Sequence, residues 1–179
     1  MIEKLVARIL AVDESISRKM RAAEKPGLLR SVATFFAHSG DSWFWGIGLV
    51  LLWIIGDPFW QKWSLAQLFL IVVLAVIVLL FKFSIRRKRP EGEWGAIYRN
   101  TDPHSFPSGH AARAFLIAAI AMALGPTWMA ILLSIWAPLV TLSRVMMGVH
   151  YLSDVIAGAV LGIVVTLIGL QLLPLIGLG

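Results

Sequence analysis

The sequence predicts an all-α, polytopic membrane helix bundle with about five transmembrane helices, preceded by an amphipathic helix on the membrane surface. Hydrophobic residues make up 59% of the 179 residues, and the mean hydropathy is +0.82. Soluble domains are usually about 45–50% apolar, so this chain is too apolar to be one. Long uncharged stretches recur from Ser42 to the end of the sequence. Together these observations indicate a protein that lives in a bilayer.

Uncharged runs of roughly 17–25 residues locate the predicted spans. A run of 30 uncharged residues, 114–143, is too long for one helix, and Gly125 and Pro126 divide it into two. Pro174 is expected to fray the end of the last span. The five predicted spans are 42–56 extended by 57–60, 64–81, the two halves of 114–143, and 155–179.

Residues 1–40 differ in kind from the apolar remainder. Apolar residues recur at helical spacing from Ile2 to Ile9, while charged residues fill the other faces. This pattern is typical of a helix that lies on the membrane surface. We interpret it as a plain anchor, with a lid or a sensor of anionic lipid as the alternative. The chain is therefore divided into a membrane-surface arm, 1–40, and a single transmembrane core domain, 41–179.

Three polar clusters stand out against the apolar background. Each pair of predicted crossings returns the chain to the side of the membrane from which it started. The predicted spans therefore place all three clusters on one face of the membrane, although they are far apart in sequence. In chain order the clusters are Lys82 with Arg89 and Pro90; Pro107, Ser108, Gly109 and His110; and Ser143, Arg144, His150 and Asp154.

The second cluster lies where a polar loop enters the third predicted span. The free N–H groups of a helix's first turn and the positive end of its dipole bind anions. Pro107 suits such a start, and Gly109 leaves room for a phosphate oxygen to approach closely. An ordinary helix cap at Ser108 is the alternative interpretation of these residues.

His150 and Asp154 are four residues apart, which on one helix face brings the imidazole and the carboxylate together. A carboxylate that holds one ring nitrogen leaves the other free to act as a nucleophile or base. The alternative is a buried salt bridge that closes the start of a helix. A metal site is less favoured because no HExxH motif or dense carboxylate cluster accompanies the pair. The sequence has no cysteine, which excludes a disulfide, a thiolate nucleophile and a cysteine-ligated metal.

The basic run that leaves the second predicted span has two parts. Arg86, Arg87 and Lys88 are interpreted as a solvated patch that faces lipid headgroups. Lys82 and Arg89 are assigned instead to the candidate site because of their spacing.

The three clusters resemble the signature of the type 2 phosphatidic acid phosphatase family, which is itself similar to the vanadium haloperoxidases. That signature is a lysine, six residues and Arg-Pro; then Pro-Ser-Gly-His; then Ser-Arg, five residues, His, three residues and Asp. Every element occurs here at that spacing, and the resemblance extends from about Trp43 to the end. Larger relatives place another transmembrane helix before the amphipathic segment, so their usual six-helix count is not expected here.

The resemblance implies a lipid phosphatase that works through a phosphohistidine and needs no metal or other cofactor. His150 is implied as the nucleophile that attacks phosphorus, Asp154 as the group that orients it, and His110 as the acid and base. Cations would take the place of a metal, so activity should survive EDTA and be blocked by vanadate. The implied phosphate ligands are Lys82, Arg89, Ser108, Gly109 and Arg144.

The expected partners are a lipid phosphate and the bilayer, with no nucleic acid. A phosphate whose tail stays in the membrane suits a site at the membrane edge. Candidates are polyprenyl phosphates or diphosphates, including undecaprenyl diphosphate, phosphatidic acid, phosphatidylglycerol phosphate, polyprenyl-phosphoryl sugar phosphates and lipid A. A non-enzymatic protein that binds anionic lipid or conducts anions is the alternative; it does not explain His110 or the spacing of His150 and Asp154. Residues of the loop over the site are expected to tune headgroup choice: Glu91, Glu93, Trp94, Tyr98, Asn100, Asp102 and His104.

The expected location is the cell membrane, as a multi-pass protein of a bacterial inner membrane. All but Lys62 of the 16 lysines and arginines fall on the face that carries the clusters. The positive-inside rule then favours the cytoplasm for that face. The family resemblance favours the opposite side, since many bacterial members work on the outer face.

Overall fold

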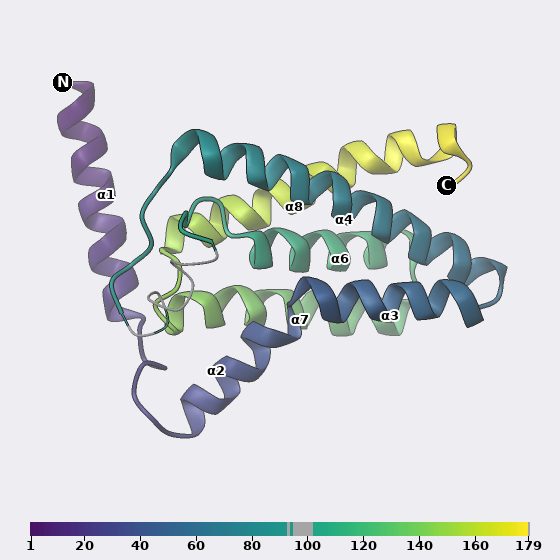
Figure 1. Ribbon diagram of the computed structural model, residues 1–179, viewed down its shortest axis with the longest axis horizontal. Helices are drawn as coiled ribbons and strands as arrows, with labels where there is room; N and C mark the ends of the chain where they lie inside the picture. The colour runs from purple at the N-terminus through teal and green to yellow at the C-terminus, as the bar shows by residue number, and fades with distance from the viewer. Residues whose placement is uncertain (93, 95–101, 179) are drawn as a thin grey trace.

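The computed structural model describes residues 1–92, 94 and 102–178, and the regular elements in these ranges are helices. In Figure 1, α3, α4, α6, α7 and α8 run along the long axis, and α1 crosses one end of the bundle. The predicted all-α bundle is therefore confirmed. The elements are α1 (Ile2–Lys19), α2 (Leu28–Ser39), α3 (Ser42–Ile55), α4 (Pro58–Ile85), α6 (Gly109–Leu124), α7 (Thr127–Met146), α8 (Leu152–Leu172) and the 3₁₀ helix η1 (Leu173–Ile176).

Within the residues that the structure describes, three stretches of helix are long and apolar enough to cross a membrane, namely α4, α7, and α8 together with η1. The helices α3 and α6 are also apolar but shorter, with 14 and 16 residues. Large apolar side chains are exposed along the outer faces of α4 and α8, as expected for a bundle surrounded by lipid. The count of five spans stays a prediction.

The turn between α3 and α4 is set by Asp57. Its carboxylate accepts hydrogen bonds from the N–H groups of Phe59 at 2.9 Å and Trp60 at 3.1 Å. Pro58 suits the first helical position because its missing N–H would have no partner there. The prediction that 57–60 extend the preceding span is therefore wrong, since Asp57 caps a new helix.

The other helix boundaries differ from the predicted spans mainly where polar residues occupy a first turn. Gly125 and Pro126 separate α6 from α7, as predicted. The helices α6 and α8 begin earlier than the uncharged runs that started at Ala114 and Val155. Charged side chains in these first turns belong to the candidate site, so a search for uncharged runs excludes them.

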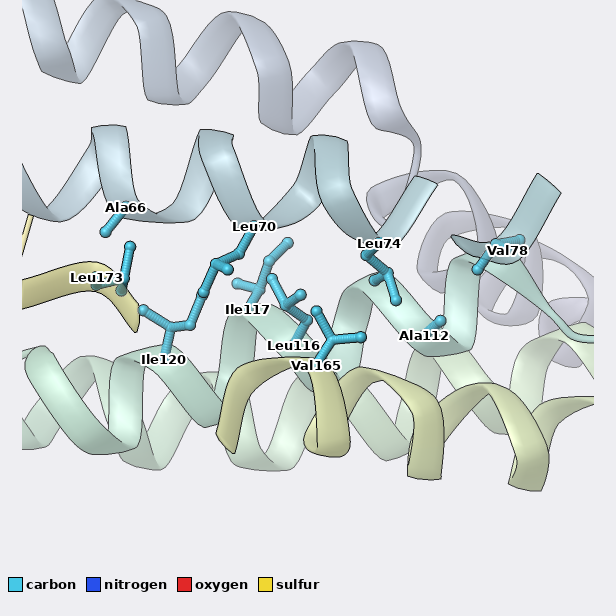
Figure 2. Packing of buried hydrophobic residues seen from close by; sticks show 10 residues of the cluster. All are labelled: Ala66, Leu70, Leu74, Val78, Ala112, Leu116, Ile117, Ile120, Val165 and Leu173. Carbon is cyan, nitrogen blue, oxygen red and sulfur yellow. The ribbon is translucent and has the colours of Figure 1, made fainter. Parts of the chain in front are cut away.

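The core lies between α4, α6 and α8 (Figure 2). Because α6 packs against α4, α7 and α8, it lies at the centre of the bundle. Buried residues of α4 recur every fourth position and face apolar residues of α6. Glycines let α8 approach α6 closely, because a Cβ at Gly162 would lie 2.1 Å from the carbonyl oxygen of Ala112. The core cluster comprises Ala66, Leu70, Leu74, Val78, Ala112, Leu116, Ile117, Ile120, Val165 and Leu173.

One end of the bundle gathers the segments that carry the polar clusters. Figure 1 shows α1, α2, the chain entering α6 and the turn between α7 and α8 at this end. The α3–α4 turn, the α6–α7 turn and the C-terminus lie at the other end. The arrangement agrees with the expectation that all three clusters share one face.

Candidate active site

A cavity of about 240 Å³ lies at the end of the bundle where the clusters meet. Its lining divides into an apolar wall from α4 and a polar group of charged and imidazole side chains. The apolar wall consists of Ile71, Leu74, Ala75, Val78 and Leu79. The polar group consists of Lys82, Arg89, Asp102, His110, Arg113, Arg144 and His150.

Three buried cations, Lys82, Arg89 and Arg144, give the cavity a positive character. The carboxylate of Asp102 accepts hydrogen bonds from Lys82 and from Arg89 Nη2, the latter at 2.7 Å. Arg89 Nε also donates to the backbone carbonyl of Asp102 at 2.6 Å. Burial opposes the charge of this carboxylate, but Lys82 and Arg89 outweigh it and lower the pKa of Asp102. The carboxylate of Asp102 thus pairs with two of the cations that the sequence predicts to bind phosphate.

His150 lies in the turn between α7 and α8 and is almost fully buried. Its Nε2 is 3.2 Å from Arg89 Nη1, which also donates to the carbonyl of Val149 at 2.9 Å. Since a guanidinium only donates, Nε2 accepts and the ring proton belongs on Nδ1. Burial, together with the positive charges of Arg89, Arg144 and Lys82, holds the pKa of His150 well below its usual value. A neutral imidazole with its lone pair on Nε2 is the nucleophilic form.

Asp154 lies behind His150, with 3.6 Å between its Oδ2 and Nδ1 of the imidazole. That distance is too long for a hydrogen bond. The prediction that both residues share a helix face is wrong, because His150 precedes α8 and Asp154 occupies its first turn. The same Oδ2 accepts the N–H of Tyr151 at 2.9 Å, which fixes the carboxylate at the helix start.

Arg87 contradicts the interpretation of the basic run as a lipid-facing patch. Its guanidinium donates to Asp154 Oδ1 and to Asp13 Oδ2, both at 2.7 Å. Only 16% of its side chain is exposed, whereas Arg86 and Lys88 lie on the surface as expected. Arg87 turns inward because two carboxylates at this end of the bundle need a cation.

His110 occupies the first turn of α6 and lines the cavity. Its Nε2 lies 2.8 Å from Oδ1 of Asp41, the residue that precedes α3. The other oxygen of Asp41 lies 3.1 Å from Nδ1 of His38. Burial opposes the charge of Asp41, but the hydrogen bonds with His110 and His38 outweigh it and lower the pKa of Asp41. An ionised carboxylate therefore holds one nitrogen of the second histidine.

Gly109 and Ser108 differ in their relation to the cavity. Gly109 lines it. Ser108 is the N-cap of α6, and its buried hydroxyl accepts a long hydrogen bond of 3.5 Å from the N–H of Ala111. The N–H of Ser108 donates to the backbone carbonyl of Asp154 at 3.0 Å, which joins the second and third clusters. Ser108 thus stands at the helix start, outside the cavity lining.

The sequence did not point to two residues at the cavity or next to it, Arg113 and Asp41. Asp41 looks like an ordinary cap before an apolar run, and nothing local indicates that it meets His110. Arg113 follows His110 by three residues, a spacing that places both on one side of α6. Its guanidinium donates to the carbonyl of Gly40 and, at 2.5 Å, to the hydroxyl of Ser42. Arg113 thereby ties the α2–α3 turn to the site.

Some of the predicted loop residues have a place in the structure and others do not. Asp102 reaches the cations, and His104 packs edge-on against Phe83 with ring centroids 5.9 Å apart. Glu93, Tyr98 and Asn100 lie outside the described residues. Among the residues that are described, no group of three or more His, Asp or Glu side chains forms a candidate metal site.

Comparison with known proteins decides the family. The sequence model of the PAP2 superfamily matches residues 63–176, which include all three clusters. The chain belongs to the PAP2 superfamily.

PAP2 relatives match most of this chain. A probable lipid phosphate phosphatase beta from Arabidopsis thaliana is 30% identical, over 94% of this chain and 92% of its own length. A decaprenylphosphoryl-5-phosphoribose phosphatase from Mycobacterium tuberculosis is 33% identical over 88% and 84%, respectively. The crystal structure of a PAP2-type phosphatidylglycerolphosphate phosphatase from Bacillus subtilis superposes with a TM-score of 0.75 and 25% identity, covering 92% of this chain and 85% of that one.

These PAP2 relatives confirm the resemblance noted in the sequence. They are named as phosphatases, and the chain is a phosphatase of a membrane family, as predicted. The alternative of a purely binding or conducting protein is thereby disfavoured.

Proposed function

We propose that this chain removes a terminal phosphate from a membrane lipid, as a monoester or a diphosphate, through a phosphohistidine on His150. The observation that carries the proposal is the two-part cavity. Its cations and imidazoles suit a phosphate, and its α4 wall of apolar side chains suits the hydrocarbon chain attached to that phosphate.

In the first step the lone pair on Nε2 of His150 forms a bond to phosphorus, and the bond from phosphorus to the leaving oxygen breaks. Protonated His110 gives its proton to that oxygen, so the lipid leaves as an alcohol or a lipid monophosphate. Asp154, 3.6 Å from Nδ1, stabilises the positive charge that the imidazole acquires. The Arg89 N–H that donates to Nε2 turns to an oxygen of the phosphoryl group, which frees the lone pair for the attack.

In the second step His110 takes a proton from water, and the water oxygen attacks phosphorus. The bond between phosphorus and Nε2 breaks, which releases inorganic phosphate and returns both histidines to their starting forms. Asp41 supports both steps, since its carboxylate stabilises the imidazolium form of His110. Phosphoryl transfer depends mainly on positioning and charge stabilisation, and the proposed oxygen ligands supply these without a metal. They are Lys82, Arg89, Arg144 and the amide of Gly109. Ser108, which lies outside the cavity lining, is proposed to hold the first turn of α6 in place.

The cavity and the names of the relatives both support one substrate class. Relatives act by name on lipid phosphates, decaprenylphosphoryl-5-phosphoribose, and phosphatidylglycerolphosphate. Phosphate on a lipid is common to these names, so we propose a lipid phosphate for this chain as well. The carboxylate of Asp102 lies where headgroup oxygens would approach and is proposed to influence which headgroup enters.

The orientation proposed here is the cytoplasmic one, because Lys62 is the only lysine or arginine in the sequence that the predicted topology places on the opposite side. A cysteine introduced at Glu91 would be unique in this cysteine-free chain. Shielding from an impermeant thiol reagent in intact cells supports a cytoplasmic site, and labelling in intact cells contradicts it.

The proposed function is tested by phosphate release from purified protein in detergent micelles, with a panel of polyprenyl and glycerophospholipid phosphates. His150→Ala should abolish release, whereas Lys62→Gln at the opposite end should leave it unchanged. Release should persist in EDTA and be inhibited by vanadate. Full activity of His150→Ala, or loss of activity in EDTA, would overturn the proposed mechanism.

A further inference from the structure

The first turn of α8, which carries Asp154, is held from outside by α1. Oδ1 of Asp13 accepts the N–H of Ser153 at 3.0 Å, and its Oδ2 accepts the Ser153 hydroxyl at 2.5 Å. The hydroxyl of Ser17 accepts the N–H of Leu152 at 2.8 Å. First-turn N–H groups have no partner inside their own helix, so residues 135 to 140 positions away in sequence complete the cap of α8.

Arg87 joins this cap to the carboxylate behind His150. One guanidinium nitrogen donates to Asp13 and another to Asp154, both at 2.7 Å. The guanidinium also lies over the ring of Tyr151, 4.0 Å from its centroid. Asp13 and Asp154 are both buried, so each carboxylate depends on Arg87 for compensation of its charge.

The same helix α1 presents apolar side chains to its surroundings. Leu5, Ile9, Val12 and Ile16 are each more than two-fifths exposed, on a face next to the one that carries Asp13. Figure 1 shows α1 lying across the end of the bundle, transverse to the long helices, as a helix in the plane of the membrane surface would lie. The neighbouring face of α1 contacts α8 through Asp13. The position of α1 at the interface is therefore linked to the position of Asp154.

We propose that Asp13 and Arg87 are positioning residues of the catalytic centre, through which the surface helix α1 fixes Asp154 behind His150. The inference rests on the proposed function, because it assigns to Asp154 the support of a nucleophilic His150. Neither residue lines the cavity, so each acts through Asp154 and not on the phosphate. The membrane-surface arm then has two roles, as an anchor and as a support for Asp154.

The test compares Asp13→Asn with Glu14→Gln, which removes the same charge from the adjacent, exposed position of α1. Asp13→Asn is expected to lower kcat about tenfold or more, since a misplacement of roughly 1 Å can reduce a rate about a hundredfold. KM for the lipid should stay within about twofold, because the phosphate ligands are untouched. Glu14→Gln should match the wild type in both constants.

Ser17→Ala keeps the proposal falsifiable if Asp13→Asn folds poorly, and a double variant tests whether Asp13 and Arg87 act through the same group. Ser17→Ala removes one cap and should give a smaller loss confined to kcat. Adding Asp13→Asn to Arg87→Gln should lower kcat no further than Arg87→Gln alone, because both act through Asp154. Equal losses in Asp13→Asn and Glu14→Gln, or a loss that appears in KM and thermal stability alone, would overturn the proposal.

His150→Ala in the same assay distinguishes a failure of the positioning role from a failure of the proposed function. An inactive His150→Ala with a fully active Asp13→Asn overturns the positioning role and leaves the proposed function standing. A fully active His150→Ala overturns both, because the positioning residues would then have no nucleophile to support.

Discussion

Nε2 of His110 lies 2.8 Å from Oδ1 of Asp41, a residue 69 positions away that precedes α3. Asp41 itself is outside the cavity lining, whereas His110 is part of it. The carboxylate engages Nε2 of the second histidine, so Nδ1 is the ring nitrogen that remains for proton transfer. Asp154 lies beside His150 in a similar way, so each histidine of the site has its own carboxylate.

Asp41→Asn should lower kcat by about tenfold to a hundredfold, because an amide cannot stabilise the imidazolium that protonates the leaving oxygen. KM should change little. Asp57→Asn is the matched control, since Asp57 also precedes a helix but lies at the opposite end. Steady-state kinetics with one lipid substrate check the prediction, and equal effects of the two variants would contradict it.

Asp102→Asn should strengthen phosphate binding. The carboxylate now engages Lys82 and Arg89, and a substrate phosphate must compete with it for the same donors. Neutralising it should lower KM and the inhibition constant of inorganic phosphate by about tenfold, the scale of one modest charge interaction. Competitive inhibition by phosphate measures this directly. An increase in both constants would show that Asp102 instead holds the cations in place for the substrate.

The pH below which kcat/KM falls should shift in opposite directions when a cation and when an anion near His150 is neutralised. Burial and the cations Arg89, Arg144 and Lys82 lower the pKa of His150, and Asp102 raises it. His150 should therefore stay neutral well below the usual imidazole pKa of about 6.5. Lys82→Gln removes a cation, raises the pKa and moves this fall in kcat/KM to higher pH.

Asp102→Asn removes an anion, lowers that pKa further and moves the fall in kcat/KM to lower pH. Both variants are compared with the wild type on one substrate, so ionisation of the substrate is the same in each profile. Shifts in the same direction would contradict the assignment of this fall in kcat/KM to His150.

Gly162→Ala should destabilise the bundle. A Cβ there would lie 2.1 Å from the carbonyl oxygen of Ala112, so α8 must move away from α6. Overpacking of this kind costs about 1–3 kcal/mol, and activity should fall because α6 and α8 carry His110 and Asp154. Gly48→Ala, where a Cβ meets nothing within 4 Å, is the control. Thermal unfolding in detergent measures both, and equal melting temperatures would contradict the close approach.

The helical bundle could be predicted from the sequence because long apolar runs and the Gly125–Pro126 break are local signals. The meeting of the three clusters at one end could also be predicted, since crossing a membrane constrains which loops share a side. The α3–α4 boundary could not, because Asp57 and Pro58 look like the edge of one span and act as the start of the next.

The partners of the site residues were harder to predict than the residues themselves. Lys82, Arg89, His110, Arg144 and His150 meet around one cavity, as the motif spacing suggested. Asp41 and Asp13 lie on segments whose own patterns indicate a cap and a surface helix. Their contacts with His110 and Arg87 depend on how α2 and α1 dock on the bundle, and a single sequence carries no direct signal of that docking.

Trapping the covalent intermediate tests the proposed phosphohistidine most directly. Wild-type protein and His150→Ala are mixed with a lipid carrying a radiolabelled terminal phosphate, quenched within one turnover, digested and mapped by mass spectrometry. We expect an acid-labile phosphate on the peptide that contains His150, and no label in His150→Ala. Label on another residue, or turnover by His150→Ala at the wild-type rate, would contradict it.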